Sequence, residues 1–136
     1  MACLDTTILI DLIGNKSANR EKALAKIEQL TGDGEALYTT RFNLAELYVG
    51  IARSKSPKAE EKLIGNLLKF IKILEFDERS SRLFGQITAY LQMLGKPVGD
   101  MDVLIAATSL ASTQRLITRN SRHFKNIPQL KVEEYG

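Results

Sequence analysis

Two aspartates open an apolar segment in the second half of the chain, in the run Gly99-Asp100-Met101-Asp102-Val103. Both suit the start of a helix, because acidic side chains favour the positive end of the helix dipole and Asp is a good N-cap residue. Three other polar points, at Asp5, at Glu46 and at residues 118–120, also lie where a predicted strand gives way to a helix, or just beyond. Such points gather at one edge of an open α/β sheet, so shared chemistry is a second explanation for these acids.

This edge is expected to collect three carboxylates, those of Asp5, Glu46 and Asp102. Clustered carboxylates repel one another and would destabilise a fold that holds no metal. Each also has a structural explanation: Asp5 as an N-cap, Glu46 as a solvated helix residue and Asp102 as a partner of the helix dipole. Glu46 interrupts an apolar helix face, which weakens its structural explanation. Oxygen ligands without thiols or clustered histidines favour Mg²⁺ or Mn²⁺ over Zn²⁺.

Thr118 and Asn120 follow the end of a predicted strand at the same edge. Thr118 can equally be an ordinary strand residue, and Asn120 an ordinary turn or cap residue. The one histidine, His123, falls in Arg122-His123-Phe124 and is expected to be structural or peripheral. Thr118 and Asn120 therefore widen the candidate site without deciding its chemistry.

Apolar periodicity predicts strands that alternate with helices along the whole chain. The strands are expected at 2–4, 36–39, 72–76, 115–118 and 130–133, and the helices at 8–13, 18–30, 41–53, 57–71, from 77 to just before 95, and 100–112, with a short helix or turn at 120–125. This order predicts an α/β fold, a three-layer α/β/α sandwich with a central parallel sheet of four to five strands, in one domain over residues 1–136.

Two details of this arrangement can be checked directly in a structure. Two helices separate the second strand from the third, and two more separate the third from the fourth, so one helix of each pair must cross or project from the sheet. The pair around Pro57 is expected to project and to form an interface. Within the helix at 41–53, Phe42, Ala45, Val49 and Ala52 are expected to face inward.

Composition fits an ordinary globular domain. The 136 residues are 44% hydrophobic and 26% charged, which allows a real core. The net charge of +3 permits an anionic partner without requiring one. No apolar run approaches the ~20 residues of a membrane helix, and no signal peptide is evident. The single cysteine, Cys3, is expected to be a small buried side chain, and a reduced, cytoplasmic setting is expected.

Other enzyme classes with an early strand-end aspartate fit less well. The chain has neither a Walker A loop nor a G-x-G-x-x-G motif. A haloacid-dehalogenase-like phosphatase needs a second Asp two residues after the first, where this chain has Thr7. A response-regulator receiver could use Asp77 as its phospho-acceptor, but the acidic pair after the first strand and the late Lys are missing.

Four motifs together resemble the PIN domain, and in particular the VapC toxin ribonucleases of toxin–antitoxin pairs. They are Leu4-Asp5-Thr6-Thr7, Asn43-Leu44-Ala45-Glu46-Leu47, Asp102-Val103-Leu104-Ile105-Ala106-Ala107 and Thr118-Arg119-Asn120-Ser121-Arg122-His123-Phe124. Each motif alone is weakly specific, whereas their order and spacing are strongly so. The resemblance covers the whole chain, including the closing segment 127–133.

The resemblance implies a Mg²⁺-dependent endoribonuclease that is usually dimeric. It also implies a VapB-like antitoxin whose C-terminal segment enters the active-site groove. The acids of the family correspond to Asp5, Glu46 and Asp102, and a fourth position that is often Asp is Asn120 here, which leaves one negative charge fewer.

Two further positions complete the predicted site. Asp100 is a candidate outer-sphere acid that could compensate for the missing charge. Thr118, together with Thr6 or Thr7, matches small hydroxyl positions that orient ligands or water.

In the implied mechanism, carboxylate-held Mg²⁺ orients a water and clamps the phosphate of RNA. Asp5 and Asp102 are the expected main ligands, and Glu46 binds the metal through water or accepts the proton of the attacking water. Basic residues could steer the RNA backbone, although each alone is more simply a solvated charge; they are Arg41, Lys96, Arg119 and Arg122. The alternative is a metal-poor, PIN-like binding module that docks an antitoxin or RNA without catalysis.

Overall fold

A five-stranded parallel sheet forms the centre of the protein. The computed structural model describes residues 1–14, 17–112 and 115–135. The strands are β1 (Ala2–Leu4), β2 (Leu37–Thr40), β3 (Lys72–Leu74), β4 (Arg115–Thr118) and β5 (Lys131–Glu134). They lie in the order β3-β2-β1-β4-β5 with every neighbouring pair parallel, which confirms the predicted α/β fold.

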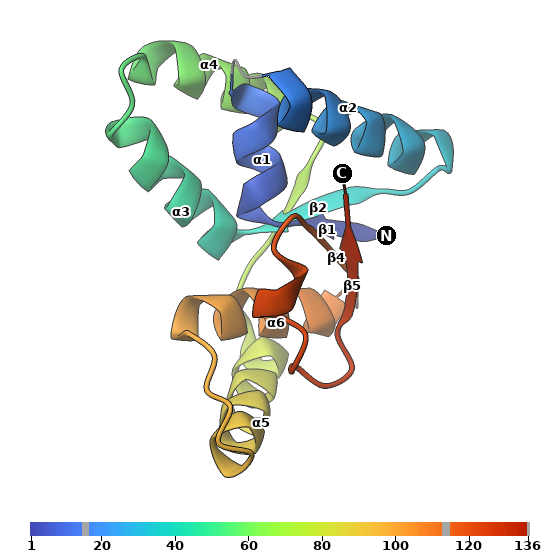
Figure 1. The fold of residues 1–136 in the computed structure, drawn as a ribbon, viewed down its shortest axis with the longest axis vertical. Coiled ribbons are helices and arrows are strands. Elements are labelled where there is room, and N and C mark those ends of the chain that lie inside the picture. The colour runs from blue at the N-terminus through green and yellow to red at the C-terminus, as the bar shows by residue number, and fades with distance from the viewer. Residues whose placement is uncertain (15–16, 113–114, 136) are drawn as a thin grey trace.

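In the described part of the chain, six α-helices cover the two faces of this sheet. They are α1 (Thr6–Ile13), α2 (Ser17–Gly32), α3 (Arg41–Ala52), α4 (Pro57–Leu67), α5 (Glu78–Met93) and α6 (Asp100–Ser112), and a short 3-10 helix, η1 (Ser121–His123), follows β4. Figure 1 shows α1, α2 and α4 on one side of the sheet, and α5 with α6 on the other. The part of the chain that the structure describes contains no helix with the length and apolar character needed to cross a membrane.

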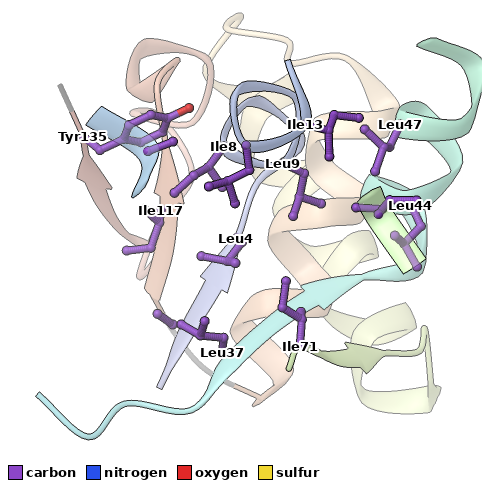
Figure 2. Close-up of a cluster of buried hydrophobic side chains, with 14 of the residues drawn as sticks. Leu4, Ile8, Leu9, Ile13, Leu37, Leu44, Leu47, Ile71, Ile117 and Tyr135 are labelled. Carbon is purple, nitrogen blue, oxygen red and sulfur yellow. The ribbon is translucent and has the colours of Figure 1, made fainter. Parts of the chain in front are cut away.

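Alternating strand residues feed two separate hydrophobic clusters, because successive side chains of a strand point to opposite faces. Leu4 and Ile117 face the cluster formed with α1 to α4, which also contains Ile8, Leu9 and Leu37 (Figure 2). Cys3 and Leu116 face the second cluster, which α5 and α6 cover. The small buried strand β1 therefore anchors both layers, and the predicted burial of Cys3 is confirmed.

The prediction for the inward face of α3 is wrong in large part. Leu44, Leu47 and Ile51 are buried, whereas Val49 is 59% exposed. The helix packs against α1 with this leucine and isoleucine stripe, so the side that carries Ala45, Val49 and Ala52 faces outward. Only Phe42 contacts apolar partners as expected, and it packs edge-on against the ring of Phe76 at 5.5 Å.

The helix pair around Pro57 packs mainly on other helices rather than on the strands, and its role as an interface stays a prediction. The α4 helix buries Ile64 in the cluster that it shares with α1 and α3. The helix that reaches farthest from the sheet in Figure 1 is α5, which packs against α6 rather than lying directly on the strands. Leu63 and Phe70, on α4 and just after it, remain 45% and 78% exposed.

Candidate active site

A cavity of about 460 Å³ opens at the C-terminal ends of β1 and β4, beside the first turn of α6. It is lined by Asp5, Thr6, Thr7, Ile10, Glu46, Gly99, Met101, Asp102, Asn120, His123 and Phe124. The structure therefore brings together the three acids predicted from the sequence, Asp5, Glu46 and Asp102, which are called the site carboxylates below. They come from β1, α3 and α6, and they meet because parallel strands end at one edge of the sheet.

Asp5 lies at the bottom of the cavity and is only 5% exposed. It occupies the N-cap position of α1, but its side chain does not make the capping hydrogen bond. Instead Asn43 Nδ2 donates to Oδ1 at 3.0 Å and Thr118 Oγ1 donates to Oδ2 at 2.7 Å. Burial raises the pKa of Asp5 and the charge of Asp102 adds to this, while the hydrogen bond from Thr118 opposes it.

Glu46 is held by a threonine from the first turn of α1. Thr6 Oγ1 donates to Glu46 Oε1 at 2.6 Å, and the carboxylate is half-buried rather than fully solvated. Burial raises the pKa of Glu46, the Thr6 hydrogen bond opposes this, and the charges of Asp5 and Asp102 raise it further. The acid that interrupts the apolar pattern of α3 thus points into the cavity.

Asp102 lies in the first turn of α6, where the helix dipole also favours a negative charge. Burial raises the pKa of its carboxyl, and the nearby charge of His123 lowers it. His123 Nδ1 is 3.6 Å from Asp102 Oδ2, and the ring is half-exposed at the cavity wall. His123 is exposed at the surface, as expected, and η1 also places it at the cavity wall beside the start of α6.

The structure does not bring Asp100 into the cavity. Asp100 is the first residue of α6, it is exposed, and it lines a smaller pocket with Thr88 and Gln92. Its predicted N-cap position belongs to Gly99, whose carbonyl accepts the first helical hydrogen bond from Val103 N at 3.1 Å.

The two predicted residues after β4 have different places. Thr118 is fully buried beneath the cavity and touches Asp5, while Asn120 lines the cavity wall. The backbone N–H of Asn120 donates to Thr118 Oγ1 at 3.0 Å, which fixes the turn between them.

Two of the four basic residues expected to steer an anion are engaged elsewhere. Arg119 makes a two-pronged ion pair with buried Asp11, at 3.0 and 3.3 Å, and Tyr135 donates to the same carboxylate at 2.6 Å. Arg41 pairs with Glu75 on the surface at 2.6 Å. The other two candidates, Lys96 and Arg122, are exposed.

Comparison with known proteins identifies the family to which this chain belongs. The PIN domain family model matches residues 2–130, which is nearly the whole chain. The chain belongs to the PIN domain family. The family predicted from the four motifs is thereby confirmed.

Named relatives of this PIN domain are VapC proteins matched over almost their full length. Ribonuclease VapC2 of Rickettsia felis is 26% identical over 132 residues, which cover 97% of this chain and 96% of the relative. The tRNA(fMet)-specific endonuclease VapC of Shigella flexneri is 29% identical over 133 residues, with 98% and 96% covered. The prediction of a VapC-type ribonuclease is confirmed by these relatives.

A solved structure extends the likeness to three dimensions. The crystal structure of VapBC2 from Rickettsia felis, bound to a DNA fragment from its promoter, contains a chain that superposes with a TM-score of 0.88. That chain is 25% identical, and the match covers 99% of the present chain and 98% of the other. The PIN-like topology is therefore shared from end to end.

Two polar residues of this PIN domain were not predicted to support the site. Asn43 is fully buried and contacts Asp5, and Asp11 is 8% exposed and holds Arg119 next to Thr118. Asn43 lies three residues before Glu46 and three after Thr40, so the sequence hints only at a helix cap. Asp11 interrupts the apolar run of α1, which is the signal that could have identified it.

The donor chemistry of the cavity fits a hard divalent cation. Its acidic donors are all carboxylate oxygens; burial raises the pKa of each, and the charge of Asp102 adds to this at Asp5 and Glu46, which a bound cation would relieve. Within the described residues, no group of three or more His, Cys, Asp or Glu side chains is arranged to hold a metal ion. Mg²⁺ often uses only one or two carboxylates and keeps several waters, so Asp5 and Asp102 suffice as candidate ligands.

Proposed function

We propose that this PIN domain, one domain over residues 1–136, hydrolyses RNA phosphodiester bonds with Mg²⁺ or Mn²⁺ as the toxin of a toxin–antitoxin pair. The observation that carries the proposal is the convergence of the three site carboxylates in one cavity. Relatives named as a ribonuclease and as a tRNA(fMet)-specific endonuclease support RNA as the substrate class.

Asp5 and Asp102 would hold the metal, and the hydrogen bonds to Asp5 leave room for this. Asn43 and Thr118 each donate to a different Asp5 oxygen and the backbone of Thr6 adds a further hydrogen bond, which together use fewer than the roughly four lone-pair sites of a carboxylate. The bound ion would supply a polarised water and charge relief at the phosphate. Thr118 and Asn43 keep the Asp5 carboxylate in one orientation, so no reorganisation is needed when RNA arrives.

Glu46 is suited to accept the proton of the attacking water. Thr6 occupies Oε1, and the described residues place no hydrogen-bond partner on Oε2. The raised pKa of Glu46 makes it a stronger base than an ordinary carboxylate. Water then attacks phosphorus, its proton passes to Oε2, the phosphorus–oxygen bond to the leaving ribose breaks, and the ribose oxygen takes a proton from solvent water.

Asn120 and the cavity wall would position the RNA. The amide of Asn120 offers donors to a phosphate without adding the negative charge of an aspartate. Asp100 would affect the site at most through the long-range effect of its negative charge, because it lies outside the cavity. The proposed setting is the cytoplasm, where RNA is available as a substrate.

Partners are proposed from the relatives and from exposed apolar residues. The similar solved structures include VapBC complexes from Rickettsia felis and Salmonella typhimurium, which supports a VapB-like antitoxin as partner of this chain. A homodimer would cover Leu63 and Phe70. Light scattering of the isolated chain should give twice the chain mass at micromolar concentration, and a monomer mass would contradict the dimer.

The direct test is cleavage of an RNA panel in Mg²⁺ and in chelator. Cleavage is expected only with the divalent ion, and Asp5→Asn should abolish it while the circular dichroism spectrum stays unchanged. Asp100→Asn is the comparison variant and should have a much milder effect. The alternative is a metal-poor binding module that docks an antitoxin or RNA without catalysis. Wild-type protein that binds RNA or antitoxin but never cleaves would establish it.

A further inference from the structure

Asn43 connects two polar features that are usually separate, the cap of a helix and the site carboxylates. Its side-chain Oδ1 accepts from Thr40 N at 3.2 Å and from Thr40 Oγ1 at 2.7 Å, which completes the capping box of α3. Its Nδ2 donates to Asp5 Oδ1 and to Thr6 Oγ1, each at 3.0 Å. The whole side chain is buried, so water does not compete for these bonds.

Every hydrogen-bonding position of the Asn43 amide is used, and this fixes its orientation. An amide has two donor hydrogens and two acceptor lone pairs, and the four contacts match them one for one. A flipped amide would place its hydrogens against the Thr40 N–H and its oxygen against a carboxylate. The cap of α3 therefore determines that a donor, and never an acceptor, faces Asp5.

The same amide also fixes the direction of the Thr6 hydroxyl. Because Thr6 Oγ1 accepts from Asn43, its single proton is directed to Glu46 Oε1 at 2.6 Å. Asn43 thus reaches two site carboxylates at once, Asp5 directly and Glu46 through Thr6. Among the described side chains, only Asn43 donates hydrogen bonds to both Asp5 and Thr6.

We propose that Asn43 is a positioning residue of the ribonuclease site, which orients Asp5 and, through Thr6, Glu46, in addition to capping α3. The inference rests on the proposed function and extends it to a residue that touches neither RNA nor metal. Residues that support ligands in this way typically contribute about 10- to 100-fold to activity or metal affinity.

Three variants separate positioning from capping. Asn43→Asp keeps the oxygen that Thr40 requires but replaces the donor to Asp5 with an acceptor. Asn43→Ala removes both functions without adding charge, and it decides the matter if Asn43→Asp does not fold. Asp77→Ala is the matched control, because Asp77 caps α5 through Ser80 N at 2.8 Å and lies outside the cavity lining.

Steady-state cleavage and thermal melting are measured for each variant, and RNA binding is measured in chelator. We expect kcat to fall about 10- to 100-fold in both Asn43 variants, with KM and RNA affinity in chelator nearly unchanged. Asp77→Ala should melt earlier and keep the wild-type kcat. If Asn43→Ala keeps kcat within about threefold of wild type and melts like Asp77→Ala, Asn43 is only a helix cap and the proposal is wrong.

A measurement without catalysis separates this inference from the proposed function. In the metal-free protein, the two Asn43 side-chain amide protons should exchange slowly with water, and their NMR signals should shift in Asp5→Asn. Fast exchange and unchanged signals would overturn the positioning role whether or not the chain cleaves RNA. Wild-type protein that shows the protected amide but cleaves no RNA would instead overturn the proposed function.

Discussion

Two acidic clusters on the same sheet are built in opposite ways. Around Arg115, at the start of β4, Glu35 and Glu133 both accept hydrogen bonds from the guanidinium, and Lys26 pairs with Glu133 as well. This group of four residues is called the Arg115 network. At the other end of β4, the three site carboxylates share a cavity whose described lining contains no Lys or Arg.

The difference appears in the pKa values of the acids. Hydrogen bonds from Arg115 lower the pKa of Glu35, and those from Lys26 and Arg115 lower that of Glu133. Burial raises the pKa of each site carboxylate, and the charge of Asp102 raises those of Asp5 and Glu46 further. The acids of the Arg115 network are paired with cations inside the fold and stabilise it. The site carboxylates have no such partner in the cavity lining and can still bind a cation.

Neutralising one acid in each cluster should give the largest contrast. Glu46→Gln is expected to lower kcat for RNA cleavage about 10²- to 10⁴-fold, the range for a general base, without lowering the melting temperature in chelator. Glu35→Gln should leave kcat within a factor of about three and lower the melting temperature. Parallel kinetic and melting measurements check both, and equal loss of activity in the two variants would remove the distinction between the clusters.

Removing the central cation of the Arg115 network should reduce stability. Arg115→Met leaves Glu35 and Glu133 partly buried without the guanidinium, and we expect a loss of about 1–2 kcal/mol in the free energy of unfolding. Urea denaturation measures this loss. Arg41→Met, which breaks the exposed pair with Glu75, is the control and should change the midpoint much less.

The two clusters should also respond oppositely to pH in the absence of metal. The site carboxylates have folded-state pKa values above their unfolded ones, so their ionisation destabilises the fold and stability rises as pH falls through these raised values. Glu35 and Glu133 have lowered values, so their contribution is present above the ordinary value of 4.5 and is lost below it. Melting in chelator should therefore show a maximum on the acid side of neutrality, and a flat profile between pH 7 and 5 would contradict the site account.

Periodicity predicts the elements well because burial repeats along each one. Both α6 and β4 begin and end at the predicted residues, while α4 ends four residues earlier than expected. The inward face of α3 could not be chosen from the pattern, because two apolar stripes at helical spacing compete there. The inward face is set by the packing of α3 against α1, which buries Leu44, Leu47 and Ile51.

The candidate site is predictable where chain topology positions the residue. Asp5 and Asp102 follow from the rule that strand ends and helix starts share one edge. Asp100 and Asp102 lie two residues apart and thus about 200° apart around the helix, so only one can face the cavity. The sequence does not say which one, and it does not reveal that Asn43 reaches across to Asp5 from another element.

The central claim is that the site carboxylates repel one another and that a divalent cation relieves them. Asp102→Asn tests it most directly, because the charge of Asp102 raises the pKa of both Asp5 and Glu46.

Melting of wild type and variant is measured in chelator and in saturating Mg²⁺. A metal at ~100 times its dissociation constant adds about 2.7 kcal/mol, a shift of about 5–15 °C for wild type. We predict a variant that melts higher than wild type in chelator and gains less from Mg²⁺. A variant that melts lower in chelator and keeps the full Mg²⁺ shift would show that Asp102 only complements the helix dipole and that the metal binds elsewhere.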